Sequence, residues 1–192
     1  MLLFLIRHGQ TEANVAAVYS GQTDVMLTEQ GREQAAALRP LLERYEFDRV
    51  YSSDLTRAVE TQRLAVPDRE GIRTPLLREI DVGSAAGCSI AKIARDHGDP
   101  KGNFTPFGGE NYAQLTDRLR EFLSRLEADP CQCAVAFSHG GLIKCMLHIV
   151  TGLGTNVVPV ANGNCNVTVF RFDGTRWNLM AWNLAGDFWS LT

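Results

Sequence analysis

Three short polar segments contain the residue types that bind and transfer a phosphoryl group. Arg7 and His8 follow one apolar run. Arg57 stands shortly after a second predicted strand, and His139 follows a third. A guanidinium group presents a planar fork of donors that matches phosphate oxygens, and free N–H groups at helix N-termini bind the same anion. Histidine adds a nucleophilic ring nitrogen or a further donor. We therefore interpret the three segments as parts of one phosphoryl site.

Two of these side chains occupy positions that a purely structural role does not explain. Arg57 falls in the first turn of a predicted helix, and His139 stands at the start of another. The helix macrodipole disfavours a cation at both places, and sequences break such rules most often at functional sites. A bound anion would remove the conflict. Taken singly, each residue is also consistent with a solvated helix face or a loop; only their combination is specific.

The elements between these residues would bring them to one edge of a sheet. Apolar runs predict buried parallel strands over Leu2–Ile6 and Ala134–Phe137, and Arg49–Ser52 is predicted to be a further short strand. Ligands of open α/β sheets bind outside the carboxyl ends of the strands. Each polar segment follows such an end, so we expect the three segments to converge.

Helices are predicted between the strands from apolar periodicity and capping residues. The first is expected from Thr28 to Leu38, with Pro40 ending or kinking it. The second is expected over Asp54–Leu64, with Ser53 as its N-cap. Three more are expected over Ile90–Asp96, Glu110–Ala128 and Gly140–Thr151. Ile72–Val82 has no clear assignment, and Gly83–Gly109 is expected to be a Gly- and Pro-rich excursion that could cover a site.

The end of the chain predicts a β-hairpin. Asp173-Gly174 is a typical two-residue turn between the predicted strands Val167–Phe172 and Thr175–Trp182. Trp177, Trp182 and Trp189 are expected to cover the sheet. The fold class is therefore predicted as α/β: a three-layer α/β/α sandwich with a mostly parallel central sheet and a C-terminal β-hairpin, in a single domain over residues 1–192.

Composition excludes several classes of protein. The 192 residues include 19 Lys and Arg against 22 Asp and Glu, and a net charge of −3 is a poor basis for binding nucleic acid or an anionic membrane. The apolar start Met1–Ile6 is far shorter than the roughly 20 residues of a spanning helix, and it lacks the features of a signal peptide. Five cysteines without a C-x-x-C pair indicate reduced thiols, so we expect a cytoplasmic protein.

The motifs, in their order along the chain, resemble the histidine phosphatase superfamily in its phosphoglycerate-mutase-like branch. The matching segments are Arg7-His8-Gly9-Gln10-Thr11 with Asn14, Ser20-Gly21-Gln22 with Asp24, Ser52-Ser53-Asp54-Leu55 with Arg57, Leu77-Arg78-Glu79-Ile80, Gly108-Gly109-Glu110 and Ser138-His139-Gly140-Gly141. The resemblance spans about residues 1–150. It implies a phosphatase member of the family, of the alpha-ribazole or broad-specificity type.

The resemblance also implies a role for each catalytic residue. His8 would attack phosphorus to form a phosphohistidine, with its other ring N–H held by a backbone carbonyl. Arg7, Arg57 and His139 would bind the phosphoryl oxygens and stabilise their charge. Glu79 would protonate the leaving oxygen and later take a proton from water, so we expect its carboxyl group to be partly buried.

Substrate contacts are implied for a second group of residues. Asn14 would add a neutral donor, and Ser20, Gly21, Gln22 and Gly140 would line the substrate. No metal or cofactor is implied, because the arginines would compensate the phosphoryl charge. The implied partner is a small-molecule phosphomonoester; no nucleic acid or membrane partner is expected, and monomer and homodimer both remain open.

The chain departs from the family in one segment. Family phosphatases often carry Gly-x-Trp-Glu-Gly where this chain has Gly83-Ser84-Ala85-Ala86-Gly87, so the substrate stays open among sugar phosphates, phosphoglycerates, nucleotides and α-ribazole phosphate. We favour a metal-independent phosphomonoester hydrolase over a phosphoglycerate-type mutase, because family mutases are longer. A catalytically silent phosphate-binding module is disfavoured by the presence of both His8 and Glu79.

Overall fold

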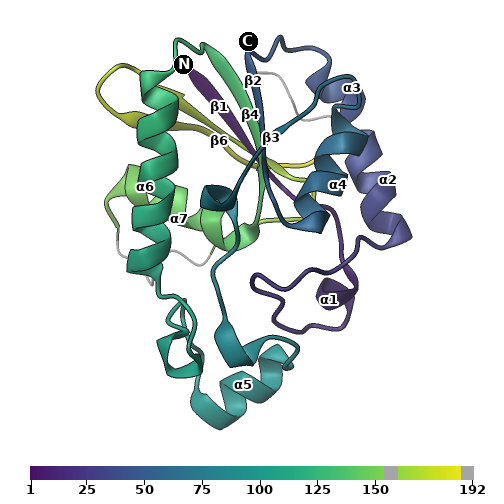
Figure 1. Cartoon of the computed structure of the whole chain (residues 1–192), viewed down its shortest axis with the longest axis vertical. Helices are drawn as coiled ribbons and strands as arrows, with labels where there is room; N and C mark the ends of the chain where they lie inside the picture. The colour runs from purple at the N-terminus through teal and green to yellow at the C-terminus, as the bar shows by residue number, and fades with distance from the viewer. Residues whose placement is uncertain (154–159, 187–192) are drawn as a thin grey trace.

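A six-stranded mixed sheet forms the centre of this computed structural model, which describes residues 1–153 and 160–186 (Figure 1). The strands are β1 (Leu2–Arg7), β2 (Arg49–Ser53), β3 (Ile72–Thr74), β4 (Cys133–Ser138), β5 (Val167–Phe172) and β6 (Trp177–Leu184). Their order is β3-β2-β4-β1-β5-β6, with β1 to β4 parallel and with β5 and β6 added as an antiparallel edge. The mostly parallel sheet and its C-terminal hairpin are thus confirmed.

Helices cover both faces of the sheet and complete the predicted three layers (Figure 1). One face packs against α2 (Glu29–Ala37), α3 (Arg39–Leu42) and α4 (Thr56–Ala65), and the other against α6 (Tyr112–Ala128) and α7 (Gly140–Thr151). Side chains of β1 alternate between the two cores, because successive residues of a strand point to opposite faces. Leu3 and Leu5 enter the core under α6 and α7, and Phe4 and Ile6 enter the opposite one.

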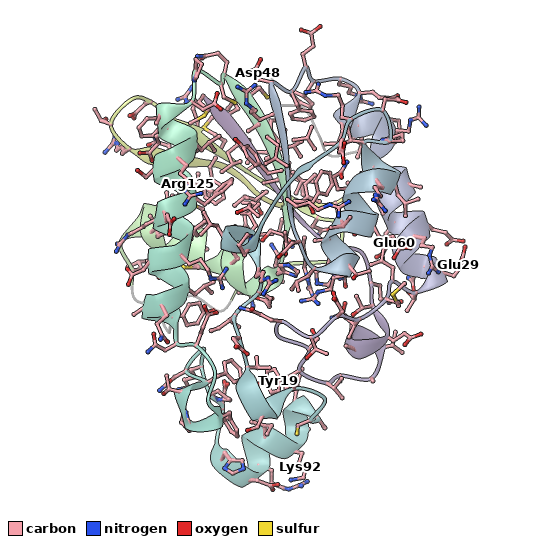
Figure 2. All side chains as sticks on the ribbon, viewed as in Figure 1. Tyr19, Glu29, Asp48, Glu60, Lys92 and Arg125 are labelled. Carbon is pink, nitrogen blue, oxygen red and sulfur yellow. The ribbon has the colours of Figure 1, made fainter. Side chains whose placement is uncertain are left out.

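A long excursion extends beyond the carboxyl ends of the strands. The 3₁₀ turn η1 (Pro75–Leu77) comes before the excursion and packs against α6 and β2. The excursion itself contains the 3₁₀ turns η2 (Gly83–Ala85) and η3 (Thr105–Phe107) and the helix α5 (Ile90–His97). Backbone hydrogen bonds join it to the loop after α1 (Glu12–Val15): Tyr19 N–H donates to the Cys88 carbonyl at 3.0 Å, and Gly87 N–H donates to the Tyr19 carbonyl at 2.8 Å. In Figure 2, Tyr19 accordingly lies between the sheet and α5. The two segments together border the polar edge of the sheet.

Two predicted helix starts are wrong, because each helix begins further along the chain than its predicted first residue. Helix α4 begins at Thr56 rather than Asp54, and its N-cap residue Leu55 makes no side-chain cap, so Ser53 is not the N-cap. The Ser53 hydroxyl accepts instead from Leu55 N–H at 3.3 Å. Helix α6 begins at Tyr112, with Asn111 as its N-cap, rather than at Glu110.

The break after α2 and the turn of the hairpin also differ slightly from the prediction. Helix α2 ends at Ala37, and Pro40 lies in the first turn of the separate helix α3. A proline there costs nothing, because an N–H in the first turn has no partner within the helix. Asp173 N–H donates to the Arg176 carbonyl at 3.1 Å, so the two-residue turn is Gly174-Thr175, one residue later than predicted.

Other predictions concern the sheet surface, the thiols and the membrane. Trp177 and Trp182 pack against the core under α6 and α7, whereas Trp189 lies outside the described residues. All five cysteines are free thiols. Among the described helices, none is long and apolar enough to cross a membrane.

Candidate active site

The carboxyl ends of β1 and β4 bring the two histidines together. Arg7 pairs with Ser138 in the parallel register, so the next residue of each strand, His8 and His139, project beyond the same edge. The two imidazole ring centroids are 5.2 Å apart. His8 is 4% exposed, and His139 and Arg57 are completely buried. The predicted convergence of the three polar segments is therefore present in the fold.

His8 is held as a neutral imidazole with one free ring nitrogen. Its Nδ1 donates to the Gly9 carbonyl at 2.7 Å, which leaves the lone pair on Nε2. Burial, then the charges of Arg57 and Arg7, lower the pKa of His8 well below its ordinary value. Position 9 requires glycine, because a Cβ there would lie 2.4 Å from the Gly31 carbonyl oxygen. The local backbone thus leaves a lone pair free in a buried, electropositive site.

Arg57 organises the loop that follows α1. Its guanidinium donates to the Gly21 carbonyl at 2.6 Å, to the Thr23 carbonyl at 2.9 Å and, through Nε, to His139 Nδ1 at 3.2 Å. Burial lowers the pKa of Arg57, and the Glu79 carboxylate opposes that shift. A buried arginine with three fixed partners is a rigid part of the site rather than a solvated helix residue.

The contact with Arg57 determines the protonation of His139. Since Nδ1 accepts from Arg57, the ring hydrogen of His139 is on Nε2, and this buried atom has no partner among the described residues. Burial, then the nearby charge of Arg57, lowers the pKa of His139 well below its ordinary value. His139 is therefore a neutral donor at the N-terminus of α7, and the conflict expected for a charged histidine there does not arise.

Arg7 and Glu79 face this pair of histidines. Arg7 donates through Nη1 to the Asn162 carbonyl, whereas its buried Nε has no partner among the described residues. The half-buried Glu79 carboxylate accepts from Ile80 N–H at 2.9 Å and from Gly141 N–H at 3.1 Å. A free imidazole lone pair, unpartnered buried donors and an oriented carboxylate therefore occupy one site. This combination suits nucleophilic attack on a centre that carries anionic oxygens.

The residues predicted to line the substrate lie around this site but differ in what their side chains do. Asn14 Oδ1 accepts from Thr11 N–H and from Asn164 Nδ2, both at 3.1 Å, and its Nδ2 has no partner among the described residues. Gln22 donates to the Glu79 carbonyl at 3.2 Å and accepts from Arg78 at 3.3 Å, so it braces the loop.

The other three predicted substrate-lining residues, Ser20, Gly21 and Gly140, contribute backbone groups to the site. Gly21 has a positive φ of 49° and presents its carbonyl to Arg57, and the Ser20 carbonyl accepts from Thr23 N–H at 2.9 Å. Gly140 is the first residue of α7. A Cβ at Gly140 would lie 3.5 Å from Arg7 Nε, so its backbone borders the unpartnered donor of Arg7.

Sequence reasoning missed the asparagines before β5. Asn164 Nδ2 donates to the His8 carbonyl at 3.0 Å, and Asn162 supplies the carbonyl that holds Arg7. Both Asn162 side-chain polar atoms are buried and have no partner within the described part of the chain. The only sequence signal is the turn-forming run Asn162-Gly163-Asn164 directly before a strand. On α4, the Thr61 hydroxyl accepts from Gly9 N–H at 3.0 Å.

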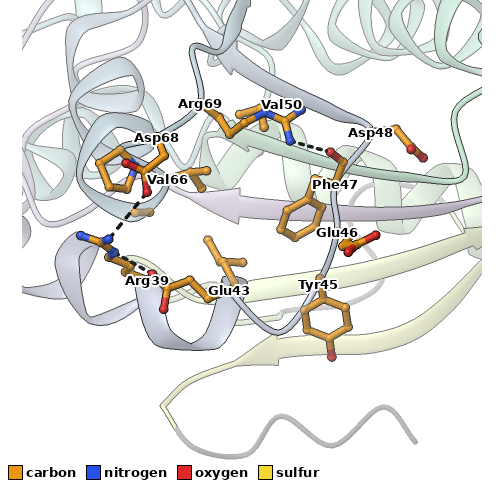
Figure 3. Close-up of a pocket in the computed structure, with 13 residues that line it drawn as sticks. Arg39, Glu43, Tyr45, Glu46, Phe47, Asp48, Val50, Val66, Asp68 and Arg69 are labelled. Atoms are coloured by element: carbon orange, nitrogen blue, oxygen red, sulfur yellow. Dashed lines mark hydrogen bonds and ion pairs between the residues drawn. The ribbon is translucent and has the colours of Figure 1, made fainter.

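A hollow far from this site lacks the free cations that a phosphoryl group needs. It has a volume of about 450 Å³ and lies beside the amino-terminal end of β2, whereas the histidines follow carboxyl ends (Figure 3). Arg39 is paired there with Glu43 at 2.8 Å and Asp68 at 3.7 Å, and Arg69 donates to the Phe47 carbonyl at 3.0 Å. Within residues 1–153 and 160–186, no group of three or more His, Cys, Asp or Glu side chains could hold a metal ion.

Neutral buried histidines predict that stability falls in acid. Unfolded histidines bind protons near pH 6.5, whereas His8 and His139 have lower pKa values when folded, so the unfolded state binds more protons between the two values. The contribution of the two histidines to the free energy of unfolding is present above about pH 6.5 and is lost as the pH falls toward their folded-state pKa values. The loss is up to about 1.4 kcal/mol per pH unit for each histidine. Urea unfolding between about pH 7.5 and pH 5 measures this slope. H139Q should flatten it and H97Q, at an exposed position, should not; equal slopes in all three proteins would contradict the account.

Substituting Gly141 should displace the Glu79 carboxylate. A Cβ at position 141 would lie 2.2 Å from Glu79 Oε1, which is the movable end of a side chain. We therefore expect Gly141→Ala to lower kcat by about 10- to 100-fold while leaving the melting temperature almost unchanged. Steady-state kinetics and thermal unfolding measure the two effects. A fully active G141A enzyme would show that the position of Glu79 does not matter.

The fold and this histidine-centred site together define one family of enzymes. The family model of the histidine phosphatase superfamily (branch 1) matches residues 3–185. The chain therefore belongs to the histidine phosphatase superfamily, and it is a phosphoric monoester hydrolase.

Several curated relatives that the chain resembles are named phosphatases. The chain is 36% identical to the adenosylcobalamin/alpha-ribazole phosphatase of Salmonella typhimurium over 77% of this chain and 78% of that protein. It is 30% identical to the glucosyl-3-phosphoglycerate phosphatase of Mycolicibacterium vanbaalenii over 96% and 95% of the two chains. Among solved structures, mycobacterial glucosyl-3-phosphoglycerate phosphatase in complex with VO₃ has a TM-score of 0.85 at 30% identity, covering 96% of this chain and 99% of that one.

Proposed function

We propose that this protein is a metal-independent phosphomonoesterase that transfers the phosphoryl group of a small metabolite to His8 and then to water. The observation that carries the proposal is the state of His8: its Nδ1–H is fixed on the Gly9 carbonyl at 2.7 Å, and its pKa is lowered well below the ordinary value. A neutral imidazole with a free Nε2 lone pair is the form that can act as a nucleophile.

In the first step, His8 Nε2 attacks phosphorus in line with the ester oxygen. The N–P bond forms as the P–O bond to the leaving group breaks, and the protonated Glu79 carboxyl gives its proton to the leaving oxygen. Donors from Arg7, Arg57 and His139 Nε2–H contact the remaining phosphoryl oxygens, with the Gly140 N–H at the start of α7 beside them.

In the second step, water attacks the phosphohistidine from the position that the leaving group has vacated. The Glu79 carboxylate takes a proton from that water, the N–P bond breaks, and inorganic phosphate and neutral His8 are released. The contacts of the Glu79 carboxylate with Gly141 N–H and Ile80 N–H support this double role, because each fixes one oxygen and leaves the second lone pair of that oxygen available. Asn14 Nδ2 is a further donor for the substrate, and Ser20, Gly21 and Gln22 form its border.

The proposed substrates are small phosphorylated metabolites such as those named for the relatives. We propose further that residues 1–192 form one domain, since both cores share the single sheet. The cytoplasmic location and the choice between monomer and homodimer stay predictions, which cell fractionation and light scattering test.

A screen of phosphate release tests the proposed reaction. The panel contains α-ribazole 5′-phosphate, glucosyl-3-phosphoglycerate, sugar phosphates, nucleotides and 3-phosphoglycerate, each with and without EDTA. We expect release of inorganic phosphate from at least one compound at a rate that EDTA leaves unchanged. Interconversion of phosphoglycerates without phosphate release would establish the mutase alternative. Loss of activity with EDTA that added metal restores would contradict the metal-independent reaction.

A further inference from the structure

The segment that carries Glu79 has little regular structure of its own, and one remote side chain holds it. Arg118, on α6, donates through Nη1 to the carbonyls of Pro75 at 3.3 Å, Leu76 at 3.1 Å and Arg78 at 2.8 Å. Its Nη2 donates to the carbonyl of Glu79 itself at 3.1 Å. A single guanidinium thus contacts four backbone carbonyls along the approach to the carboxylate, and at least one Nη1 hydrogen is shared between two of them.

Glu110 closes this arrangement from the other side of Glu79. Its carboxylate pairs with Arg118 through two contacts, at 2.9 Å from Nη2 and 3.2 Å from Nε. The same carboxylate accepts from Asp81 N–H at 2.8 Å, and Glu110 N–H donates to the Asp81 carbonyl at 2.8 Å. The side chains of Arg118 and Glu110 are only 15% and 21% exposed. The ion pair therefore brackets Glu79, with contacts to the backbone before and after it.

These contacts require arginine in particular. Its rigid fork of five donors can reach several carbonyls and a carboxylate at once, whereas the ammonium group of lysine is a point charge with three donors. Gln22 gives the Glu79 carbonyl one further contact, at 3.2 Å, but from the opposite, loop side. The position of the Glu79 backbone therefore depends chiefly on α6, which packs against the sheet through its buried apolar residues.

We propose that Arg118, together with Glu110, is a positioning residue that fixes Glu79 for proton transfer in the proposed phosphatase reaction. The inference rests on the proposed function, because it assumes that Glu79 is the proton donor and acceptor. Proton transfer by a positioned side chain contributes about 10²- to 10⁴-fold to a rate, and a displacement of about 1 Å can cost 10²-fold.

The dependence of the rate on the leaving group separates positioning of the acid from a general structural effect. The ester oxygen of p-nitrophenyl phosphate leaves without protonation, whereas that of an alkyl phosphate needs the proton of Glu79. For each variant, kcat/KM is measured with both substrates, since kcat/KM reports the steps up to phosphorylation of His8. We expect Arg118→Met to lower kcat/KM by about 100-fold on the alkyl phosphate and by less than about 5-fold on p-nitrophenyl phosphate. Inhibition by inorganic phosphate should change by less than about 3-fold, because the donors around His8 are intact.

Matched variants complete this experiment. Arg118→Lys should restore part of the alkyl phosphate activity, and Glu110→Gln, which keeps an acceptor for Asp81 N–H, provides the same test if Arg118→Met does not fold. Arg125→Met is the control on the same helix: Arg125 lies on the outer face of α6, paired with Glu121, and the rates should stay unchanged (Figure 2).

The outcomes distinguish this inference from the proposed function. Glu79→Gln in the same series should show the largest difference between the two substrates. If it treats them alike, the role of Glu79 fails. If Glu79→Gln discriminates between them but the Arg118 and Glu110 variants lose both activities equally, or lose neither, the positioning role is overturned and the proposed function stands.

Discussion

Replacing His8 by alanine is expected to lower kcat by on the order of 10⁵-fold or more, the largest effect of any substitution in the chain. The physical reason is that the variant has no nucleophile in place of the neutral Nε2 that the Gly9 carbonyl leaves free. Water would have to attack the ester directly, with only the surrounding donors to help it. Steady-state phosphate release with the best substrate of the panel measures the loss.

The same variant should still bind phosphate. Arg7 Nε and His139 Nε2 have no hydrogen-bond partner among the described residues, and removing the His8 ring leaves both donors available to an anion. Inhibition or calorimetry should therefore give a dissociation constant for phosphate within about 10-fold of the wild-type value. His97→Ala, at an exposed position on α5, is the matched control and should be fully active. An H8A enzyme that kept wild-type turnover would refute the mechanism outright.

Arg57→Lys is expected to have the second largest effect, a loss of about 10³-fold in kcat/KM together with a lower melting temperature. Lysine keeps the charge but cannot serve the carbonyls of Gly21 and Thr23 and the His139 ring at the same time. The loop at residues 20–24 would lose hydrogen bonds that hold it, and the His139 tautomer would no longer be fixed. Each buried group left unsatisfied costs about 1–3 kcal/mol.

An arginine on the surface provides the control for Arg57. Arg32 pairs with Glu60 at 2.8 Å between α2 and α4, on the outer side of the helices where Figure 2 labels Glu60 and Glu29. Arg32→Lys should change the free energy of unfolding by less than about 1 kcal/mol and leave the activity unchanged. Thermal unfolding and kinetics of both variants make the comparison. Wild-type kcat/KM in Arg57→Lys would show that the guanidinium geometry is dispensable.

The strands and the edge at which they converge could be predicted because each strand is encoded locally. Leu2–Ile6 and Ala134–Phe137 are continuous apolar runs, and both prove to be buried on both faces of the sheet. Polar residues directly after such runs have few structural reasons to be there. The resemblance to the family then predicts the acidic segment with Glu79, which no strand end or apolar periodicity indicates.

What could not be predicted depends on contacts between distant parts of the chain. The segment after β3 shows no periodicity because Arg118, some forty positions further on, supplies its hydrogen-bond donors. Asp54 looks like part of a helix start, yet its carboxylate receives two contacts of 2.7 Å from Arg78, and the helix begins two residues later. The hydrogen bond of Asn164 to the His8 carbonyl likewise joins residues that are far apart in the sequence, so no local pattern predicts it.

Trapping of a phosphorylated enzyme tests the central claim most directly. The protein is mixed rapidly with a ³²P-labelled substrate, quenched in alkali and digested, and the labelled peptide is sequenced. We predict a single phosphoryl group that is stable in alkali and labile in acid, carried by the peptide that contains His8 and absent from His8→Ala. Label on another residue, or turnover without any labelled intermediate under conditions where hydrolysis of the phosphoenzyme limits the rate, would contradict a phosphohistidine at His8.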